Sequence, residues 1–242
     1  MKNQDFKKQD LLKAPIVEVF KSIQGEGKGL GKPSIFVRFF GCSLRCRFQG
    51  KTCDTPYAVS QEEDKAYLMT SLELAKVIMK FKLRNIVYTG GEPTLYQDFI
   101  VETISILNSK SEDYFHEVET NATIPLGILF EGHIDRFNMS VKLKSSNQLN
   151  EQFDKKRINY EAINTFPNYG YFKFVVSDEN DIKEILKLHK KFPQFEVYLM
   201  PQGKTRKDII KNSPAVIDIC MKYGFTFSPR EHIIIYDSKR GV

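Results

Sequence analysis

The chain has 242 residues, of which 41% are hydrophobic and 27% are charged, and its formal net charge is +6. This length suits one well-cored domain, and the composition is ordinary for a soluble globular protein. No apolar run reaches the roughly 18 residues of a membrane span, the polar start lacks a secretory signal, and no block of basic residues indicates a nucleic-acid face. We therefore expect a single cytoplasmic domain over residues 1–242, with neither a membrane nor a nucleic acid as its partner.

The N-terminal part of the chain shows a strand, a glycine-rich loop and a second strand. Residues 1–15 are read as a polar lead-in, and residues 16–23 alternate as a strand does. The segment QGEG suits a tight loop in which Gln24 and Glu26 face a ligand, although a plain hairpin turn explains it equally well. In the next apolar run, SIFVRFF, Arg38 needs a carboxylate partner, either from the protein or from a ligand.

Three of the four cysteines lie in one loop, residues 41–58, at Cys42, Cys46 and Cys53. Thiolates so close together can converge on one soft metal centre. Zinc would need a fourth ligand, and the loop has no histidine, whereas a [4Fe-4S] cluster held by three thiolates would leave one iron open. A zinc knuckle completed by a distant histidine and buried unreactive thiols are the alternatives. Disulfides are disfavoured, because three clustered cysteines cannot all pair.

The rest of the chain alternates between strands and helices. Strands are predicted at residues 85–89, 115–120, 137–143, 171–176, 195–199 and around 232–236. Helices are predicted after a capping box at Thr70 and Glu73, and over residues 95–107, 179–191 and 205–223, the last interrupted by Pro214. This alternation indicates a parallel α/β sheet or barrel, in which ligands bind at the carboxyl ends of the strands. Polar residues fall at those ends, namely Gly90-Gly91-Glu92, Glu119 with Asn121, Ser140 with Lys142, and Pro201-Gln202.

The cysteine loop, the turn Gly90-Gly91-Glu92-Pro93 and the polar strand ends together resemble the radical S-adenosylmethionine (SAM) enzymes. The resemblance implies an α/β fold, a partial, modified (β/α)6 barrel with mostly parallel strands. It also implies a [4Fe-4S] cluster whose open iron is chelated by SAM, and reductive cleavage of SAM to a 5'-deoxyadenosyl radical.

Further motifs resemble one family of these enzymes, the 7-carboxy-7-deazaguanine synthases, and the resemblance spans about residues 17–232. The motifs are Ser22-Ile23-Gln24-Gly25-Glu26-Gly27, Phe36-Val37-Arg38-Phe39, Cys53-Asp54-Thr55-Pro56-Tyr57, Thr89-Gly90-Gly91-Glu92-Pro93, Glu119-Thr120-Asn121 and the segment 140–143. That family converts 6-carboxy-5,6,7,8-tetrahydropterin to 7-carboxy-7-deazaguanine with loss of ammonia, in queuosine biosynthesis. The resemblance therefore implies a ring-contracting lyase.

The same resemblance assigns roles to individual residues. The cluster ligands would be Cys42, Cys46 and Cys53. The SAM contacts would be Gly90, Gly91, Glu92, Asn121, Ser140 and Lys142, with Pro201 and Gln202 near the adenosine. The pterin contacts would be Gln24, Glu26, Arg38, Thr89 and His232, with Arg38 on the substrate carboxylate. A Mg²⁺ position is matched by Thr55, together with Asp54, and a hydroxyl, water and substrate oxygens are suitable ligands for so hard a cation.

The cysteine spacing departs from the common pattern. Many radical SAM enzymes use C-x3-C-x2-C, whereas six residues separate Cys46 from Cys53 here, which leaves the path of residues 47–52 open. The family also implies a homodimer and a flavodoxin-like electron donor.

Two other functions remain as alternatives. A glycyl-radical activase would share the SAM chemistry but would lack pterin-reading groups such as Gln24, Glu26 and Arg38. A zinc-containing nucleic-acid-binding module would account for the three cysteines and the pI near 9.0, but it gives the Gly90-Gly91-Glu92 turn no role.

Overall fold

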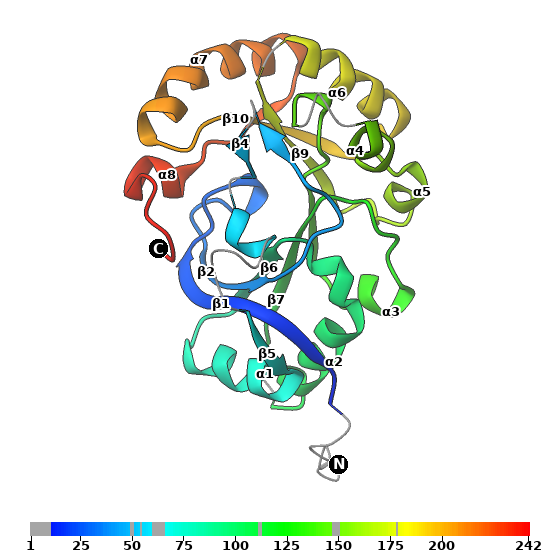
Figure 1. The fold of residues 1–242 in the computed structure, drawn as a ribbon, viewed down its shortest axis with the longest axis vertical. Helices are drawn as coiled ribbons and strands as arrows, with labels where there is room; N and C mark the ends of the chain where they lie inside the picture. The colour runs from blue at the N-terminus through cyan, green and yellow to red at the C-terminus, as the bar shows by residue number, and fades with distance from the viewer. Residues whose placement is uncertain are drawn as a thin grey trace.

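The computed structural model describes residues 11–48, 51–53, 55–59, 66–110, 113–146, 151–177 and 179–242. Within these ranges a nine-stranded sheet runs through the molecule, with helices around it (Figure 1). Its strands are β1 (Lys13–Ile23), β2 (Pro33–Phe39), β5 (Tyr67–Thr70), β6 (Asn85–Gly90), β7 (Phe115–Thr120), β8 (Arg136–Met139), β9 (Tyr171–Val176), β10 (Glu196–Pro201) and β11 (Thr226–Phe227). The helices are α1 (Ser71–Lys80), α2 (Gln97–Asn108), α3 (Ile128–Glu131), α4 (Glu151–Lys156), α5 (Tyr160–Ile163), α6 (Glu179–Lys191), α7 (Arg206–Tyr223) and α8 (Glu231–Tyr236).

The strand order of the sheet is β11-β10-β9-β8-β7-β6-β2-β1-β5. Each neighbouring pair from β11 to β2 is parallel, whereas β1 pairs antiparallel with both β2 and β5. The sheet does not close into a barrel, because β5 and β11 form its two edges. The predicted α/β fold, a partial barrel of mostly parallel strands, is therefore confirmed, and β1 and β5 are its antiparallel part.

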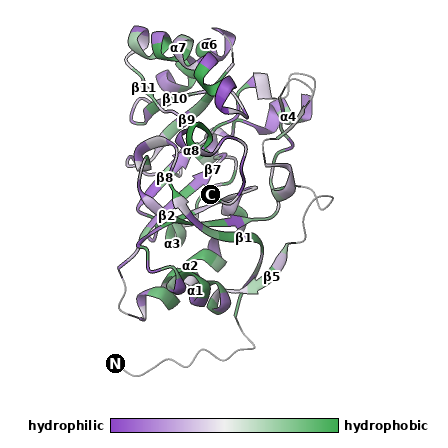
Figure 2. Cartoon of the chain, turned by 90° about the vertical axis from the view of Figure 1, so that its left-hand side faces the viewer, coloured by the Kyte–Doolittle hydropathy of each residue, from purple (hydrophilic) through white to green (hydrophobic). Residues whose placement is uncertain are grey.

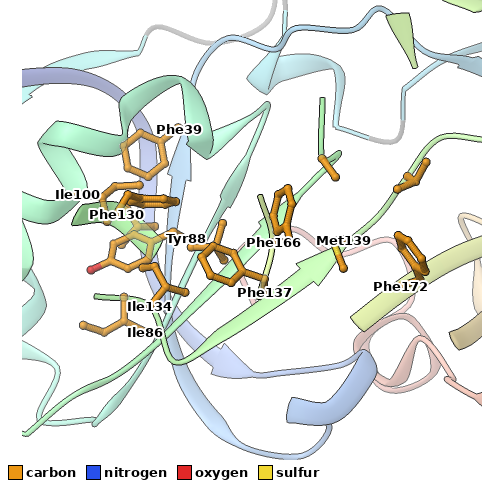
Figure 3. Close-up of a cluster of buried hydrophobic side chains, with 14 of the residues drawn as sticks. Phe39, Ile86, Tyr88, Ile100, Phe130, Ile134, Phe137, Met139, Phe166 and Phe172 are labelled. Carbon is orange, nitrogen blue, oxygen red and sulfur yellow. The ribbon is translucent and has the colours of Figure 1, made fainter. Parts of the chain in front are cut away.

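Alternation along the strands separates an apolar face from a polar face. In β9, Phe172 and Phe174 belong to the hydrophobic core, whereas Lys173 between them lines a cavity on the other face. In β7, Val118 is in the core and Glu119 lines the cavity. Figure 3 shows the core cluster, which includes Phe39, Ile86, Tyr88, Ile100, Phe130, Ile134, Phe137, Met139, Phe166 and Phe172.

Helices α1, α2, α3, α5, α6 and α7 contribute side chains to the core on the apolar face of the sheet. In α1, the predicted capping box is present, because the Thr70 side chain accepts from the Glu73 N–H and the Glu73 carboxylate accepts from the Thr70 N–H. Helix α6 buries Ile182, Ile185 and Leu188, and Figure 2 shows hydrophobic and hydrophilic segments alternating along α6 and α7. None of the helices in the described ranges combines the length and the apolar character that crossing a membrane would require.

Two predicted boundaries near strands are wrong. The polar lead-in was expected to reach residue 15, but β1 begins at Lys13 and pairs with β5, and Ala14 is fully buried. Residues 1–10 lie outside the described residues. The strand predicted over residues 137–143 ends at Met139, where the Ser140 N–H makes the last bond to the neighbouring strand, to Thr120 O at 2.7 Å.

Two predictions for the C-terminal part are also wrong. Helix α7 is continuous with Pro214 inside it, since the carbonyl that the proline leaves without a partner belongs to Ile210 on the exposed side of the helix. The strand predicted around residues 232–236 is helix α8. This helix packs on the loop after β1, where the Glu231 N–H donates to Gly25 O at 2.9 Å. Tertiary contact with that loop therefore overrides the β-branched sequence.

Candidate active site

A cavity of about 410 Å³ opens at the carboxyl ends of the parallel strands. It receives side chains from β2, β6, β7, β9, the loop after β1 and the C-terminal segment. The residues predicted from the sequence that line it are Gln24, Glu26, Arg38, Cys42, Cys46, Cys53, Thr55, Thr89, Gly90, Gly91, Asn121, Ser140, Lys142 and His232. The structure thus brings together most of the predicted site, from positions scattered over the chain.

The cysteine loop folds so that its three thiols meet the same cavity. The long gap between the second and third cysteine forms a small hairpin of β3 (Arg47–Phe48) and β4 (Lys51–Thr52). Its base is closed by the Cys53 N–H, which donates to Cys46 O at 3.1 Å. The unusual spacing is therefore taken up by a hairpin, and Cys46 and Cys53 lie next to one another.

The surroundings of Cys42 suit a bound thiolate. Its Sγ accepts from the Leu44 N–H at 3.4 Å and from Asn121 Nδ2 at 3.6 Å. Burial, and then the Glu92 carboxylate, raise the pKa of the free Cys42 thiol, so a cation is needed to hold the thiolate there. Among the described residues, no three thiol, imidazole or carboxylate groups lie close enough to hold a single metal ion. Three thiols facing one cavity, with N–H donors to sulfur, are a donor set that fits an iron-sulfur cluster.

The two glycines after β6 allow close packing against the cysteine loop. Gly90 has φ +118°, and a Cβ on Gly91 would lie 1.9 Å from Gly41 O. The Gly91 N–H donates to Phe39 O at 3.1 Å, and the Glu92 N–H donates to Gly41 O at 2.8 Å. The turn is therefore attached to the start of the cysteine loop by its backbone, which only glycine at these positions permits.

Glu92, which was predicted to contact SAM, is not among the residues that line the cavity. Its side chain is fully buried, and burial raises its pKa. One oxygen accepts from the Thr120 hydroxyl at 2.6 Å and the Thr94 hydroxyl at 2.7 Å, and the other accepts from the Asn121 N–H at 2.7 Å. The carboxylate thus joins the ends of β6 and β7 behind the cavity wall.

Pro201 and Gln202 are not cavity-lining residues either, although both were predicted to lie near the adenosine of SAM. The residues on either side of them, Met200 and Gly203, do line the cavity. Lys142 Nζ donates to Ser140 Oγ at 2.9 Å, so these two predicted SAM contacts are held together. Asp54 lies outside the described residues.

Glu26 stands at the centre of a group of cations. Its carboxylate is bound by Lys173 Nζ and by Arg230 Nε, the latter at 3.0 Å, and His232 Nε2 lies 3.9 Å away. Burial alone would raise the pKa of Glu26, but Lys173, Arg230 and His232 outweigh it and hold that pKa below its ordinary value. Glu26 is thus ionised throughout the neutral range.

Glu119 is a second carboxylate on the cavity wall. It accepts from the Thr89 hydroxyl at 2.8 Å and from Gln24 Nε2 at 3.3 Å, and Lys173 Nζ lies 3.6 Å away. One layer deeper on the same face of β7, Glu117 pairs with Arg136 at 3.3 Å. Burial and the Glu119 charge raise the pKa of Glu117 to about 7.

Arg38 finds its carboxylate partner within the protein. Its Nε binds Glu18 Oε1 at 2.7 Å across the β1–β2 pair, in which the two residues are in register. Glu18 also binds Arg240 at 3.4 Å, and the Tyr57 ring lies between the two guanidinium groups. Both members of the Arg38–Glu18 pair are partly exposed, so Arg38 remains available to a ligand in the cavity.

Sequence reasoning missed Lys173 and Arg230, which both line the cavity. A signal for Lys173 was present, because a lysine inside the strand YFKFVV cannot share the face of its aromatic neighbours. Arg230 gave no such signal, since its site depends on a contact across 204 residues.

Comparison with known proteins gives consistent findings. Residues 36–191 match the family described as the radical SAM superfamily. The 7-carboxy-7-deazaguanine synthase of Halobacterium salinarum is 32% identical over 246 residues, covering 92% of this chain and 90% of the relative. That of Aquifex aeolicus is 32% identical, covering 86% of each chain. The crystal structure of QueE from Escherichia coli superposes with a TM-score of 0.70 at 21% identity, over 91% of this chain and 95% of that one, and so shares its fold.

Proposed function

The chain belongs to the radical SAM superfamily and, within it, to the 7-carboxy-7-deazaguanine synthases, and we propose that it converts 6-carboxy-5,6,7,8-tetrahydropterin to 7-carboxy-7-deazaguanine and ammonia. The observation that carries this proposal is one cavity that joins the three cysteines to Gln24, Glu26, Arg38, Thr89 and His232. A glycyl-radical activase or a zinc module would have no use for these polar groups, and the family of the chain speaks against both.

The cofactors of this family fit the residues on the cavity wall. Cys42, Cys46 and Cys53 would hold the [4Fe-4S] cluster, and SAM would lie against Gly90, Gly91, Asn121, Ser140 and Lys142. When bound, the cluster and SAM supply a 5'-deoxyadenosyl radical that takes a hydrogen atom from the substrate. Thr55 lines the cavity and, with Asp54, would hold Mg²⁺.

The protein contributes binding and orientation. Arg38 presents a guanidinium beside the cavity for the substrate carboxylate, and this carboxylate competes with Glu18 for it. Glu26 accepts from N–H groups of the heterocycle, while Gln24 and Thr89, both fixed by Glu119, form the wall beside it. His232 is held near Glu26, and burial lowers its pKa, so it is neutral at neutral pH and offers one N–H. These contacts hold the ring in one orientation toward the SAM side of the cavity.

The remaining features of the proposal concern the whole enzyme. It is a single-domain cytoplasmic enzyme that acts as a homodimer and receives electrons from a flavodoxin-like donor. The family membership of the chain supports these statements.

An anaerobic assay tests the proposed reaction. Protein reconstituted with iron and sulfide is incubated with dithionite, SAM, Mg²⁺ and the carboxytetrahydropterin, and the products are followed by mass spectrometry. We expect 7-carboxy-7-deazaguanine from the wild type and its loss in Arg38→Ala, while Arg84→Ala, on the surface away from the cavity, serves as the control. Formation of 5'-deoxyadenosine without the deazapurine would agree with radical SAM chemistry but would show that the substrate is a different compound.

A further inference from the structure

Lys173 is a buried cation between two carboxylates of the cavity. It lies on β9, is 3% exposed, and its ammonium group binds Glu26 and lies 3.6 Å from Glu119. Glu26 belongs to the loop after β1 and Glu119 to the end of β7, so the lysine joins three elements that are far apart in the chain. A charge in such a position is kept only where its partners need it.

Glu26 depends on this cation for its charge. Its carboxyl group is buried, and burial alone favours the protonated form. Burial lowers the pKa of Lys173, but Glu119 and Glu26 outweigh it and raise that pKa above its ordinary value. The lysine is therefore always protonated; it holds Glu26 as a carboxylate and lies beside Glu119.

Both carboxylates retain the capacity to accept from a ligand. An ionised carboxylate offers about four acceptor sites, of which Glu26 uses two, for Lys173 and Arg230. Glu119 accepts from Thr89 at one oxygen and from Gln24 and Asn138 at the other, and it also lines the cavity, where the oxygen that Thr89 binds can accept from a ligand as well. Carboxylates accept hydrogen bonds and donate none. The two together therefore match the edge of a heterocycle that carries several N–H groups.

We propose that Lys173 is a positioning residue for the substrate, which binds Glu26, lies beside Glu119 and holds the two carboxyl groups correctly spaced as a paired acceptor for the N–H edge of the heterocycle. This inference rests on the proposed function, because it takes the pterin as the ligand. The paired acceptor makes the cavity selective for rings that present amino or N–H groups at this edge, over rings of the same shape that present acceptor atoms there.

The other charged and titratable groups around this site do not replace the lysine. The groups that face it are Arg230, His232, Glu117, Arg136 and Tyr171. Arg230 reaches Glu26 but is also bound to Gly203 O at 2.8 Å, and Arg136 is paired with Glu117. Without Lys173, Glu119 therefore has no bound cation and faces Glu117 from the same strand.

The test is a binding measurement on SAM-loaded holoenzyme without reductant, so that no turnover occurs. Titration calorimetry with 6-carboxytetrahydropterin at pH 6 and pH 8 compares wild type, Lys173→Met and Lys173→Arg, with Lys187→Met on the exposed face of α6 as the control. We expect Lys173→Met to bind about 10- to 100-fold more weakly, and more weakly at pH 6 than at pH 8, because a carboxylate then takes up a proton. Wild type, Lys173→Arg and the control retain the cation or the whole site, so their affinity should change less between the two pH values than that of Lys173→Met.

Iron content is measured for each variant to separate binding from folding. If Lys173→Met fails to hold iron, the double variant Lys173→Met/Glu119→Gln, which removes the surplus negative charge, is expected to fold and to bind weakly at both pH values. Unchanged affinity in Lys173→Met, an equal loss at pH 6 and pH 8, or loss of iron in both variants would each overturn the proposal. If the wild type does not bind the pterin, the proposed function is wrong as well. The other outcomes concern only the role of Lys173.

Discussion

At the scale of single residues, Arg38 is a half-buried cation that has a protein partner and can still bind a ligand. Its guanidinium is already paired with Glu18, and Arg240 shares the same carboxylate. The arrangement satisfies the cation while the cavity is empty, yet it leaves the pair at the cavity wall. The pair thus stabilises the fold, and its arginine can also bind the substrate.

This arrangement predicts the effect of removing the Glu18 charge. In Glu18→Gln the substrate carboxylate no longer competes with, or is repelled by, a neighbouring carboxylate, so we expect KM for the pterin to fall about threefold to tenfold. Steady-state kinetics under anaerobic conditions measure it. Glu196→Gln, which removes an exposed carboxylate paired with Lys28, is the control and should leave KM unchanged. A rise in KM would mean that Glu18 orients Arg38 and does not compete with the ligand.

Glu117 predicts a pH dependence of stability. Its pKa is about 7 in the folded chain, against an ordinary value of 4.5, so between these values the folded chain binds a proton that the unfolded chain has lost. Stability therefore falls as the pH rises from about 4.5 to about 7, by about 3 kcal/mol from this group, and stays level above. Glu117→Gln should lack this fall.

The measurement is the apparent Tm at pH 5.5 and pH 8, at a single scan rate. The wild type should lose more Tm between these values than Glu117→Gln does, by several degrees. Glu151→Gln on the exposed α4 controls for the loss of one negative charge. Equal losses in the wild type and in Glu117→Gln would show that the Glu117 carboxyl is ionised in the folded chain at pH 5.5.

Many site residues could be predicted from the sequence, because the residues that contact a ligand belong to recognisable motifs. It did not reveal the partners behind them. Glu92 was expected at the cavity, but its neighbours Thr94, Thr120 and Asn121 enclose it. Which side of a turn a carboxylate faces depends on packing between two strands, and a local pattern does not contain that information.

At the scale of elements, the turn after β6 and the cysteine loop form one unit. A side chain on Gly91 would collide with the Gly41 carbonyl, which cannot move without shifting the first cysteine beside it. We expect Gly91→Ala to fold but to lose most of its cluster, as measured by iron content and by absorbance near the visible charge-transfer bands. Gly132→Ala is the control, because a Cβ there would meet its nearest atom at 3.5 Å. Full iron content in Gly91→Ala would show that the two loops separate easily.

The elements themselves were predicted best where the sheet is parallel and buried. β6 and β9 contain mostly apolar residues and were predicted as strands, whereas the segment of α8, EHIIIY, has the composition of a strand but is a helix. It forms a helix that packs on the loop after β1, where the Glu231 N–H donates to Gly25 O and the glycine at position 25 leaves room for His232. Local propensity predicts helix or strand correctly where tertiary contacts favour the same structure, and wrongly where they favour the other.

At the scale of the whole molecule, the open sheet predicts where two copies meet. Its edge strand β5 exposes Tyr67 at 68% and Leu68 at 66%, an apolar edge that a monomer would leave to water. We expect light scattering to give twice the chain mass of 28.1 kDa, and Leu68→Lys to give the monomer. Ile128→Lys, at an exposed position on α3, is the control. A dimer that survives Leu68→Lys would place the contact on another face.

The meeting of Glu26 with Arg230, 204 positions later, has a consequence for the enzyme during its synthesis. The thiols at positions 42, 46 and 53 come long before α8 and Arg230 in the chain, so the cluster ligands are synthesised before the part of the pocket that Arg230 completes. A chain that has reached the cysteine loop but not Arg230 therefore lacks a complete substrate pocket. The pterin acquires its full set of contacts only after the segment that carries Arg230 has been made.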